Sequence, residues 1–598
     1  MTREEINRRI RNLEEQIQSL PTGTIKTKQV NGKDYYYLRK KENGSLKDKY
    51  VPFDEIETLR KNLDLRKDLQ KELKILETTE PTAMPDFLCK VSTGADLKDL
   101  SLRVAGYRKR EAFSYLHDYI YNTLSDRVFV LYGLRRTGKT TMMRQLLLDF
   151  TDDEREKAAF IEVSRGDTLP NIYKDLKTLK SIGIKYVFID EVTLIEDFIE
   201  GSAFLSDIFA SSGMKIVLSG TDSLGFVLSE DEQLYDRTVT LHTTFIPYRE
   251  FENVLGIRGI DEYIRYGGTM CVSGTSYNSV SPFRNRRTAN EYVDSSIAEN
   301  IQHSLTYYKD GGHFRSLYAL YEKNELTSAV NRVVEDMNHL FTVDVLTRDF
   351  KSHDFSISRR NLLNAQKDTS DILESIDIAA ITARLKDMLS IRNREEQKVK
   401  ITEAVASEIK EYLELLDLIF SVDVVSISDH RTREKRILIS QPGLRYAQAE
   451  ALIESLLEDE FFETVSSEDK LFISDRILNE IRGRMLEDIV LLETSLAFPE
   501  REVFVLKFRT GEFDMVVHDR KENFCDIYEI KHSTAVVPEQ YRHLIDEDKC
   551  RKTEHFYGNI KSRNVLYRGE STTVDNINYI NVEEYLKALP LIKPVTYL

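Results

Sequence analysis

The chain has 598 residues and a formal net charge of −16, with 31% charged and 41% hydrophobic residues. One hydrophobic core does not organise a chain of this length, so we expect several domains. No apolar run approaches the roughly 18–20 residues that a membrane span needs, and the charged N-terminus lacks the apolar core of a signal peptide. The four cysteines are scattered, which argues against a zinc knuckle and a disulfide framework. We therefore expect a cytoplasmic protein without membrane contact.

Residues 1–80 are predicted to form a helix–β-hairpin–helix module. Apolar residues recur at three- and four-residue spacing from Ile6 to Leu20, which is typical of an amphipathic helix. Asn31-Gly32 then separates two short alternating runs and indicates a hairpin. A second apolar stripe covers residues 55–77, and the proline-containing segment 80–85 predicts a linker.

The predicted hairpin is rich in lysine and tyrosine, and two interpretations of it remain open. Basic residues such as Lys26, Lys28 and Lys33 neutralise phosphates, and the tyrosines at 35–37 stack on bases, so DNA or RNA contact is one interpretation. The other interpretation is a module for dimerisation or for docking a protein partner.

Residues 100–245 alternate apolar strand-like runs with helical stretches. The runs are short and almost free of polar residues, and they cover Val128–Tyr132, 158–163, 186–189, 216–218 and 239–241. This pattern predicts a parallel sheet that is covered by helices on both faces.

A phosphate-binding loop follows the first of these runs. Its glycines let backbone N–H groups surround a phosphate, and the N-terminus of the next helix adds a favourable dipole. Lys139 is predicted to reach the β- and γ-phosphates of ATP, and Thr140 to bind Mg²⁺. The predicted nucleotide-binding residues are Gly133, Arg136, Thr137, Gly138, Lys139, Thr140 and Thr141.

Three later positions complete the predicted ATP site. The third strand ends in Asp190-Glu191, where Asp190 is expected to contact Mg²⁺ and Glu191 to polarise the attacking water. At the end of the fourth strand, Ser219 or Thr221 is a candidate to orient that water or to sense the γ-phosphate. Arg237 is a candidate for charge stabilisation, either in cis or across a subunit interface, which leaves an oligomer open.

Residues 246–324 are predicted to be a helical extension, and residues 325–470 a helical region that is compatible with a winged helix. From residue 478 the element types alternate again. A helix over 484–496 precedes strand-like runs at 503–507, 512–517 and 525–531, and a polar helix is expected over 538–555. Residues 478–598 are therefore predicted to form a separate α/β domain.

This last domain carries an Asp on one strand and Glu-x-Lys on the next, which is the core of the PD-(D/E)XK nuclease pattern. Strand alternation places Glu529 and Lys531 on one face, and a hairpin brings Asp514 beside them. Glu487 on the preceding helix fits a further acidic position. Two carboxylates of this kind bind Mg²⁺, which activates water and stabilises a charged phosphate. The alternative is a degenerate nuclease fold that is used only for binding.

Several of these motifs together resemble the bacterial and archaeal AAA ATPases with a C-terminal nuclease-like domain. Besides the loop at 133–140 and Asp190-Glu191, the resemblance rests on the runs at 219–221, 246–251 and 263–268. It implies a P-loop domain, a winged-helix middle and a restriction-endonuclease-like end, and it covers about residues 105–590.

Two functions follow from these predictions. The first is an ATPase that hydrolyses ATP with Mg²⁺ and is coupled to metal-dependent binding or cleavage of DNA or RNA. The second is an ATP-dependent switch or remodeller that binds a protein partner and has an inactive nuclease-like domain.

Overall fold

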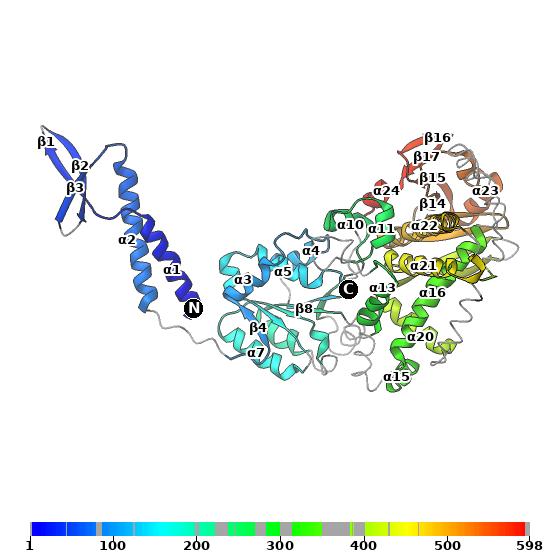
Figure 1. Ribbon diagram of the computed structural model, residues 1–598, viewed down its shortest axis with the longest axis horizontal. Helices are drawn as coiled ribbons and strands as arrows, with labels where there is room; N and C mark the ends of the chain where they lie inside the picture. The colour runs from blue at the N-terminus through cyan, green and yellow to red at the C-terminus, as the bar shows by residue number, and fades with distance from the viewer. Residues whose placement is uncertain are drawn as a thin grey trace. The chain divides into compact units, whose positions relative to one another are not determined.

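In the computed structural model, the chain divides into two compact units, Met1–Leu88 and Cys89–Leu598 (Figure 1). The structure describes residues 3–591 apart from 31, 43–44, 79–85, 123–125, 165, 196–197, 199–202, 222–236, 244, 270–282, 299–313, 350–382, 385–386, 388–400, 428–430 and 464–465. The predicted linker at 80–85 lies outside the described residues.

The smaller unit is built from two helices and a three-stranded antiparallel sheet. Its elements are α1 (Arg3–Ser19), β1 (Thr24–Val30), β2 (Lys33–Glu42), β3 (Ser45–Val51) and α2 (Ile56–Thr78). The sequence predicted a two-stranded hairpin, and β3 adds a third strand because the second turn returns the chain along β2. Leu38, Val51, Ile56 and Leu63 form the core between this sheet and α2.

The larger unit begins with a six-stranded sheet in the order β4-β6-β7-β8-β5-β9. Its strands are β4 (Lys90–Thr93), β5 (Val128–Tyr132), β6 (Ala158–Glu162), β7 (Tyr186–Asp190), β8 (Lys215–Gly220) and β9 (Thr238–His242). All neighbours pair in parallel except β4, which runs antiparallel to β6. The predicted mostly parallel sheet is confirmed. The edge strand β4 was missed because only four residues form it and they carry no long apolar run.

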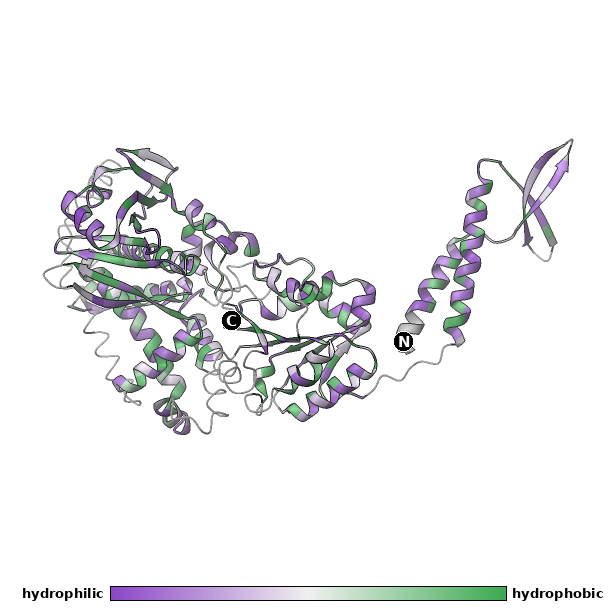
Figure 2. Cartoon of the chain, turned by 180° about the vertical axis from the view of Figure 1, so that it is seen from behind, coloured by the Kyte–Doolittle hydropathy of each residue, from purple (hydrophilic) through white to green (hydrophobic). Residues whose placement is uncertain are grey.

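Helices cover both faces of this sheet. Figure 1 shows α3 (Gly94–Leu102), α4 (Phe113–Tyr121) and α5 (Lys139–Asp149) on one face and α7 (Leu169–Ser181) on the other. Further short helices are α6 (Asp152–Glu156), η1 (Val192–Leu194), η2 (Leu205–Phe209) and η3 (Ala210–Ser212). Figure 2 shows hydrophobic strands at the centre of the sheet, as expected for strands that are buried on both sides.

The middle of the chain is helical, as predicted. It comprises α10 (Tyr248–Leu255), α11 (Ile260–Tyr266), α13 (Arg286–Val293), η4 (Asp294–Ala298), α15 (Arg315–Glu322), α16 (Leu326–Asp349), α20 (Glu403–Leu415) and α21 (Pro442–Leu457), followed by η5 (Glu460–Phe462). Two strands interrupt it, β10 (Ile419–Ile427) and β11 (Arg431–Ile439). Such a hairpin after a helix is compatible with a winged helix, but β10 also pairs in parallel with the C-terminal sheet.

The C-terminal sheet is mixed and has eight strands in the order β11-β10-β12-β13-β14-β15-β17-β16. The remaining elements are α22 (Ser467–Ala497), β12 (Glu502–Phe508), β13 (Glu512–Asp519), β14 (Phe524–Ile530), η6 (Pro538–Gln540), α23 (Glu547–Tyr557), β15 (Asn559–Tyr567), β16 (Thr572–Val574), β17 (Ile577–Asn581) and α24 (Val582–Ala588). The α/β character predicted for this end of the chain is confirmed as a mixed sheet. A separate domain over 478–598 stays a prediction, because β10 and β11 of the middle region belong to the same sheet. The helix expected over 538–555 was wrong in its extent, because Asp546 caps α23 and starts it only at Glu547.

The segment after β9 leaves the first sheet and packs against the C-terminal body. Tyr248 and Tyr263, on α10 and α11, belong to the same hydrophobic core as the buried face of α22. Glu493 on α22 accepts hydrogen bonds from the Tyr248 backbone N–H at 2.7 Å and from the Tyr263 hydroxyl at 3.1 Å. Burial nevertheless raises the pKa of Glu493 to about 7. Among the described residues, no helix combines the length and the apolarity that a membrane span needs.

We predict that Glu493→Gln reduces the loss of stability at raised pH. The folded pKa of about 7 lies above the ordinary pKa of a glutamate side chain, so the protonated side chain stabilises the fold at low pH. That stabilisation, of up to about 3 kcal/mol, is lost as the pH rises toward and through about 7. Thermal unfolding between pH 5 and 8.5 should therefore show a smaller fall in Tm for the variant.

The exposed Glu468, near the start of the same helix, supplies the matched control as Glu468→Gln. A parallel fall in Tm for wild type, control and Glu493→Gln would contradict the proposed proton on Glu493.

Candidate functional site

The loop between β5 and α5 is shaped by two glycines in the left-handed region. Gly133 has a φ of 136°, and a Cβ at this position would lie 2.3 Å from the Thr243 carbonyl oxygen. Gly138 has a φ of 90° and precedes α5 without any side-chain cap, so the first N–H groups of the helix face the loop. A larger residue at either position would therefore disturb the loop, which is what a phosphate cradle requires.

Lys139 is buried at the start of α5 and directs its ammonium into this loop. Its Nζ donates to the carbonyl oxygens of Gly133 at 2.7 Å and of Leu134 at 2.8 Å. Burial lowers the pKa of Lys139 to about 8, although the nearby Glu191 and Asp190 carboxylates oppose this shift. The ammonium is therefore desolvated and lies where an anion in the loop would stabilise its charge.

Asp190 and its predicted partner Thr140 meet at the carboxyl edge of the sheet. The Thr140 hydroxyl donates to Asp190 Oδ2 at 2.9 Å, and the Ser219 hydroxyl donates to Oδ1 of the same carboxylate. Ser219 reaches it because β7 and β8 are parallel neighbours that end together. Burial raises the pKa of Asp190, which two hydroxyl donors only partly offset.

Glu191 follows directly in a left-handed conformation with a φ of 57°. The Thr221 hydroxyl donates to Glu191 Oε2 at 3.2 Å. Ser219 and Thr221 were alternative candidates at the end of β8. In the structure they contact different acids, since Ser219 donates to Asp190 and Thr221 to Glu191. A non-glycine residue with positive φ is uncommon and often found at functional sites.

The remaining predicted loop residues have different surroundings. The buried Thr137 hydroxyl donates to the Leu134 carbonyl at 2.8 Å and lies 3.1 Å from the Thr243 hydroxyl, so it holds the loop itself. Arg136 has a φ of 64°, and its guanidinium lies 5.9 Å from the Tyr292 ring centroid. Thr141 is half-buried in the first turn of α5.

Arg237 does not reach this site within one chain. It immediately precedes β9, and its carbonyl accepts from the Val128 N–H at the amino end of β5. Its side chain lies 3.2 Å from Asp207, at the edge of the sheet opposite to the loop. A role in cis is therefore wrong, because parallel strands separate Arg237 from the carboxyl edge. A role across a subunit interface stays a prediction.

Sequence reasoning missed Arg110, a buried arginine that contacts the loop. Its guanidinium donates to the Thr137 carbonyl at 2.8 Å and to the Phe245 carbonyl at 3.1 Å. It also forms an ion pair with Glu250 at 2.6 Å, in which both side chains are about 5% exposed or less. A single arginine far upstream of the loop belongs to no motif, so only the fold reveals it.

A second group of charged residues lies on the C-terminal sheet. Lys531 Nζ lies 3.1 Å from Asp514 Oδ2 and 2.7 Å from Glu529 Oε2, and the Ile530 N–H donates to Asp514 at 2.7 Å. Burial raises the pKa of Glu529, while Lys531 and the Ile530 N–H lower that of Asp514 against the effect of burial. The structure thus brings these three predicted residues together, with Asp514 on β13, Glu529 on the adjacent β14 and Lys531 directly after β14.

Glu487 lies beside this group but has other partners. The Arg484 guanidinium donates to it, and Arg436 lies at 3.4 Å. Burial raises the pKa of Glu487 to about 7, and the negative charge of Asp514 adds to that shift. Within the described ranges, no three His, Cys, Asp or Glu side chains are arranged to hold a metal ion. The nuclease-like site that the sequence predicted from Glu487, Asp514, Glu529 and Lys531 therefore stays a prediction.

The glycine loop after β5 and the acidic end of β7 define an AAA-type P-loop domain. Residues 125–252 match the family model of an AAA domain, and residues 3–61 match a domain of unknown function. No curated protein matches the chain. A solved structure of the Orc1 protein of Aeropyrum pernix in complex with DNA aligns at 14% identity and a TM-score of 0.20. That alignment covers 64% of this chain and 96% of the Orc1 chain.

We predict that Glu250→Gln destabilises the larger unit by about 3 kcal/mol, because it leaves the buried Arg110 charge without a carboxylate. Urea unfolding measures this loss. The control is Glu252→Gln on the same helix, where the partly exposed partners Lys587 and Arg258 predict a loss below about 1 kcal/mol. Equal shifts for the two variants would show that Arg110 does not depend on Glu250.

Proposed function

We propose that the chain is a Mg²⁺-dependent ATPase with its site at the carboxyl edge of the six-stranded sheet. The observation that carries this proposal is the meeting of Thr140, Ser219 and Asp190 beside a desolvated Lys139. The match of residues 125–252 to an AAA domain supports it independently.

Each residue then has a separate role. Lys139 and the N–H groups at the start of α5 bind the phosphates, while Thr140 and Asp190 would hold Mg²⁺. The metal neutralises phosphate charge when bound. Ser219 orients the Asp190 carboxylate, and Thr221 orients Glu191, which accepts a proton from the attacking water. Arg237 would complete the site only from a second subunit of an oligomer.

The first test is nucleotide binding. Lys139→Ala should weaken ATP affinity about tenfold to a hundredfold, because a charge-assisted contact to phosphate is lost. Calorimetry measures the affinity, and Lys174→Ala, an exposed lysine on α7, is the control. Wild-type affinity in Lys139→Ala would overturn the assignment of the loop.

Glu191→Gln separates binding from turnover. We expect ATP affinity to remain while turnover falls roughly 10²- to 10⁴-fold, because the amide cannot accept the proton. Release of inorganic phosphate under single-turnover conditions measures the step. Unchanged turnover would assign Glu191 to the loop structure alone.

A second candidate function is contact with nucleic acid by the C-terminal sheet, with cleavage as its most specific form. The observation in its favour is Glu529, whose Oε1 is buried and has no hydrogen-bond donor among the described residues. Mg²⁺ prefers such carboxylate oxygens, and Asp514 lies within reach of the same lysine. The competing proposal is a binding domain in a protein switch, with residues 1–80 as a module for a protein or nucleic-acid partner.

We predict that Asp514→Asn abolishes any Mg²⁺- or Mn²⁺-dependent cleavage of DNA or RNA but leaves ATP hydrolysis unchanged, because the two sites use different strands. Purified protein is incubated with single- and double-stranded substrates, with and without ATP. Asp526→Asn, a carboxylate on β14 that accepts from Ser562 at 2.6 Å, is the control. No cleavage, or equal cleavage by both variants, favours the binding-domain proposal.

A further inference from the structure

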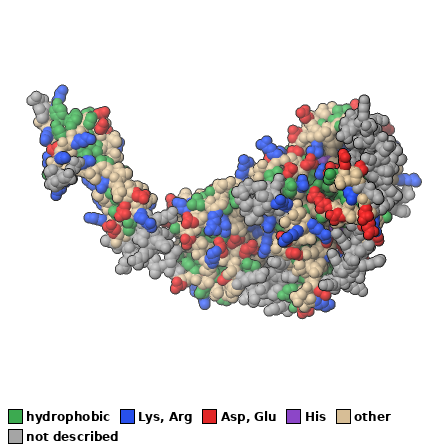
Figure 3. Space-filling model, in the orientation of Figure 1, with side chains coloured by type: hydrophobic (Ala, Val, Ile, Leu, Met, Phe, Trp, Pro, Cys, Tyr) green, Lys and Arg blue, Asp and Glu red, His purple; other side chains and the backbone are tan. Residues whose placement is uncertain are grey.

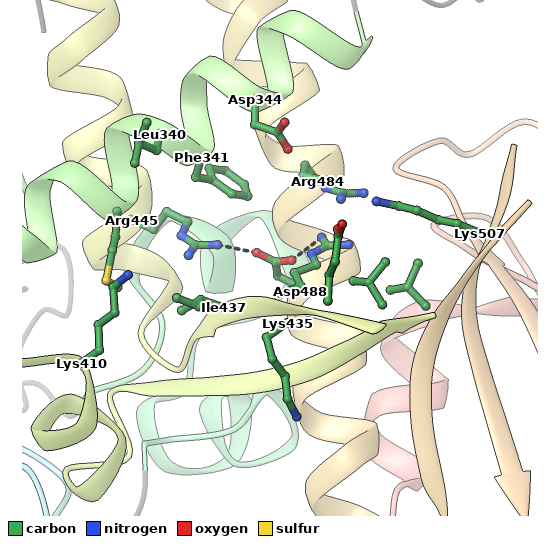
Figure 4. A pocket seen from close by; sticks show the side chains of 15 residues that line it. Leu340, Phe341, Asp344, Lys410, Lys435, Ile437, Arg445, Arg484, Asp488 and Lys507 are labelled. Carbon is green, nitrogen blue, oxygen red and sulfur yellow. Dashed lines mark hydrogen bonds and ion pairs between the residues drawn. The ribbon is translucent and has the colours of Figure 1, made fainter. Parts of the chain in front are cut away.

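A cavity of about 330 Å³ lies between the helical middle and the C-terminal sheet, within the larger unit (Figure 4). Side chains of α16, α20, α21 and α22 and of strands β10, β11 and β12 line it. Its volume is at the lower end of the range for small-molecule pockets, so it is large enough for a mononucleotide-sized group. Neither the ATP site nor the Asp514–Glu529 pair uses this cavity.

Positive charge predominates around the cavity, although the chain as a whole is acidic. Three lining residues are acidic, Asp344, Glu434 and Asp488, and six are basic, Lys410, Lys435, Arg436, Arg445, Arg484 and Lys507. Figure 3 shows basic and acidic side chains interspersed over the visible face of the larger unit, with no single broad basic face. The basic excess at the cavity is therefore a local feature.

Part of this charge is already neutralised within the wall. The Asp488 carboxylate accepts from the guanidinium groups of both Arg436 and Arg445. By contrast, the ammonium groups of Lys410 and Lys507 make no hydrogen bond or ion pair with any residue that the structure describes. These two half-exposed lysines are thus available for an anion.

The orientation of two cationic side chains, Arg484 and Lys507, also favours an anion in the cavity. Figure 4 shows the Arg484 guanidinium and the Lys507 ammonium directed toward one another across the cavity. Arg484 pairs with Glu487 and, at 3.9 Å, with Glu512, but Lys507 has no such partner among the described residues. Like charges that face each other in a partly enclosed space repel, and an anion between them converts this repulsion into attraction.

The opposite side of the cavity is apolar. Phe341 packs one ring face on the Arg445 guanidinium at 4.2 Å, and Leu340 beside it is 65% exposed. Ile437, Val424 and Val505 extend this surface over the strands. A ligand that suits both sides carries an anionic group and a flat apolar group, as the phosphate and the base of a nucleotide do.

We propose that this cavity binds a nucleotide phosphate, with Lys507 and Arg484 contacting the phosphate and the Phe341 side receiving the base. Lys410 adds positive charge from the other end of the cavity, on the Leu340 side (Figure 4). The same chemistry is offered by a single-stranded nucleic acid and by a free nucleotide. Binding here requires neither ATP hydrolysis nor strand cleavage. The proposal can therefore be true or false whatever the outcome for those two activities.

The test measures binding by the full chain carrying Lys139→Ala, which removes the contribution of the P-loop, in buffer with EDTA. The probes are fluorescein-labelled single-stranded dT12, followed by anisotropy, and dTMP, followed by calorimetry. Lys507→Gln should weaken binding of the recognised probe about tenfold, since it removes one charge-assisted contact. Lys410→Gln should weaken binding less, since it removes a charge at the other end of the cavity. Lys507→Gln should also reduce the slope of log affinity against log salt by about one.

The matched control is Lys470→Gln, a half-exposed lysine at the start of α22 that does not line the cavity. It should bind like the background protein. The pocket variants should keep the background Tm, because they remove charges without partners, and this verifies that they fold.

Binding of dT12 but not dTMP, weakened by the pocket variants, assigns the site to a strand. Binding of dTMP with the same dependence assigns it to a free nucleotide. The proposal is overturned if neither probe binds, or if Lys507→Gln and Lys410→Gln bind as tightly as Lys470→Gln.

Discussion

The buried ion pair of Arg110 and Glu250 is the constraint on which the larger unit depends. The Arg110 guanidinium donates hydrogen bonds to the Thr137 carbonyl of the P-loop, to the Phe245 carbonyl and to the Glu250 carboxylate on α10. A buried guanidinium must keep its partners, since an unpaired charge in the interior is costly. The loop and the segment after β9 are therefore held in one fixed relation.

This relation continues from α10 into the C-terminal body. Glu493 on α22 accepts from the Tyr248 backbone and from the Tyr263 hydroxyl, and the core around these tyrosines is the core of the C-terminal helices. On the same helix, Glu487 and Asp488 bind the arginines beside the cavity. The helix α22 thus carries one acid, Glu493, that holds α10 and α11, and two acids, Glu487 and Asp488, that bind the arginines of the second charged region.

The buried carboxylates of the larger unit are stabilised by three different chemistries. Asp190 accepts from two hydroxyl groups, Asp488 from two guanidinium groups, and Asp514 and Glu529 share one lysine. The two hydroxyl groups are neutral, so they leave the negative charge of Asp190 in place. The arginines beside Asp488 and the lysine beside Asp514 and Glu529 are cationic, so they neutralise the negative charge of those carboxylates. A carboxylate with uncancelled charge is the better metal ligand, so this difference favours a metal at Asp190 over a metal at Asp488. At the other site, a metal ion would have to displace Lys531 from Asp514 and Glu529 or bind these carboxylates together with it.

The sequence predicted those parts of the fold and of the proposed ATP site that depend on local patterns. The P-loop, the buried strands and Asp190-Glu191 are encoded in short runs, and Ser219 follows because adjacent parallel strands end at the same edge. Strands β4 and β10 were missed, because β4 is short and β10 lies in a region dominated by helical periodicity.

Contacts over long sequence separations could not be predicted in the same way. Arg110 precedes Glu250 by 140 residues, and Arg436 precedes Asp488 by 52. Single arginines and acids of this kind form no motif, and at the surface each would be an ordinary solvated charge. Only the packing of α10 and α22 turns them into buried pairs. The same packing faces Arg484 toward Lys507, so a local anion site arises in a chain whose total charge of −16 argues against a general affinity for anions.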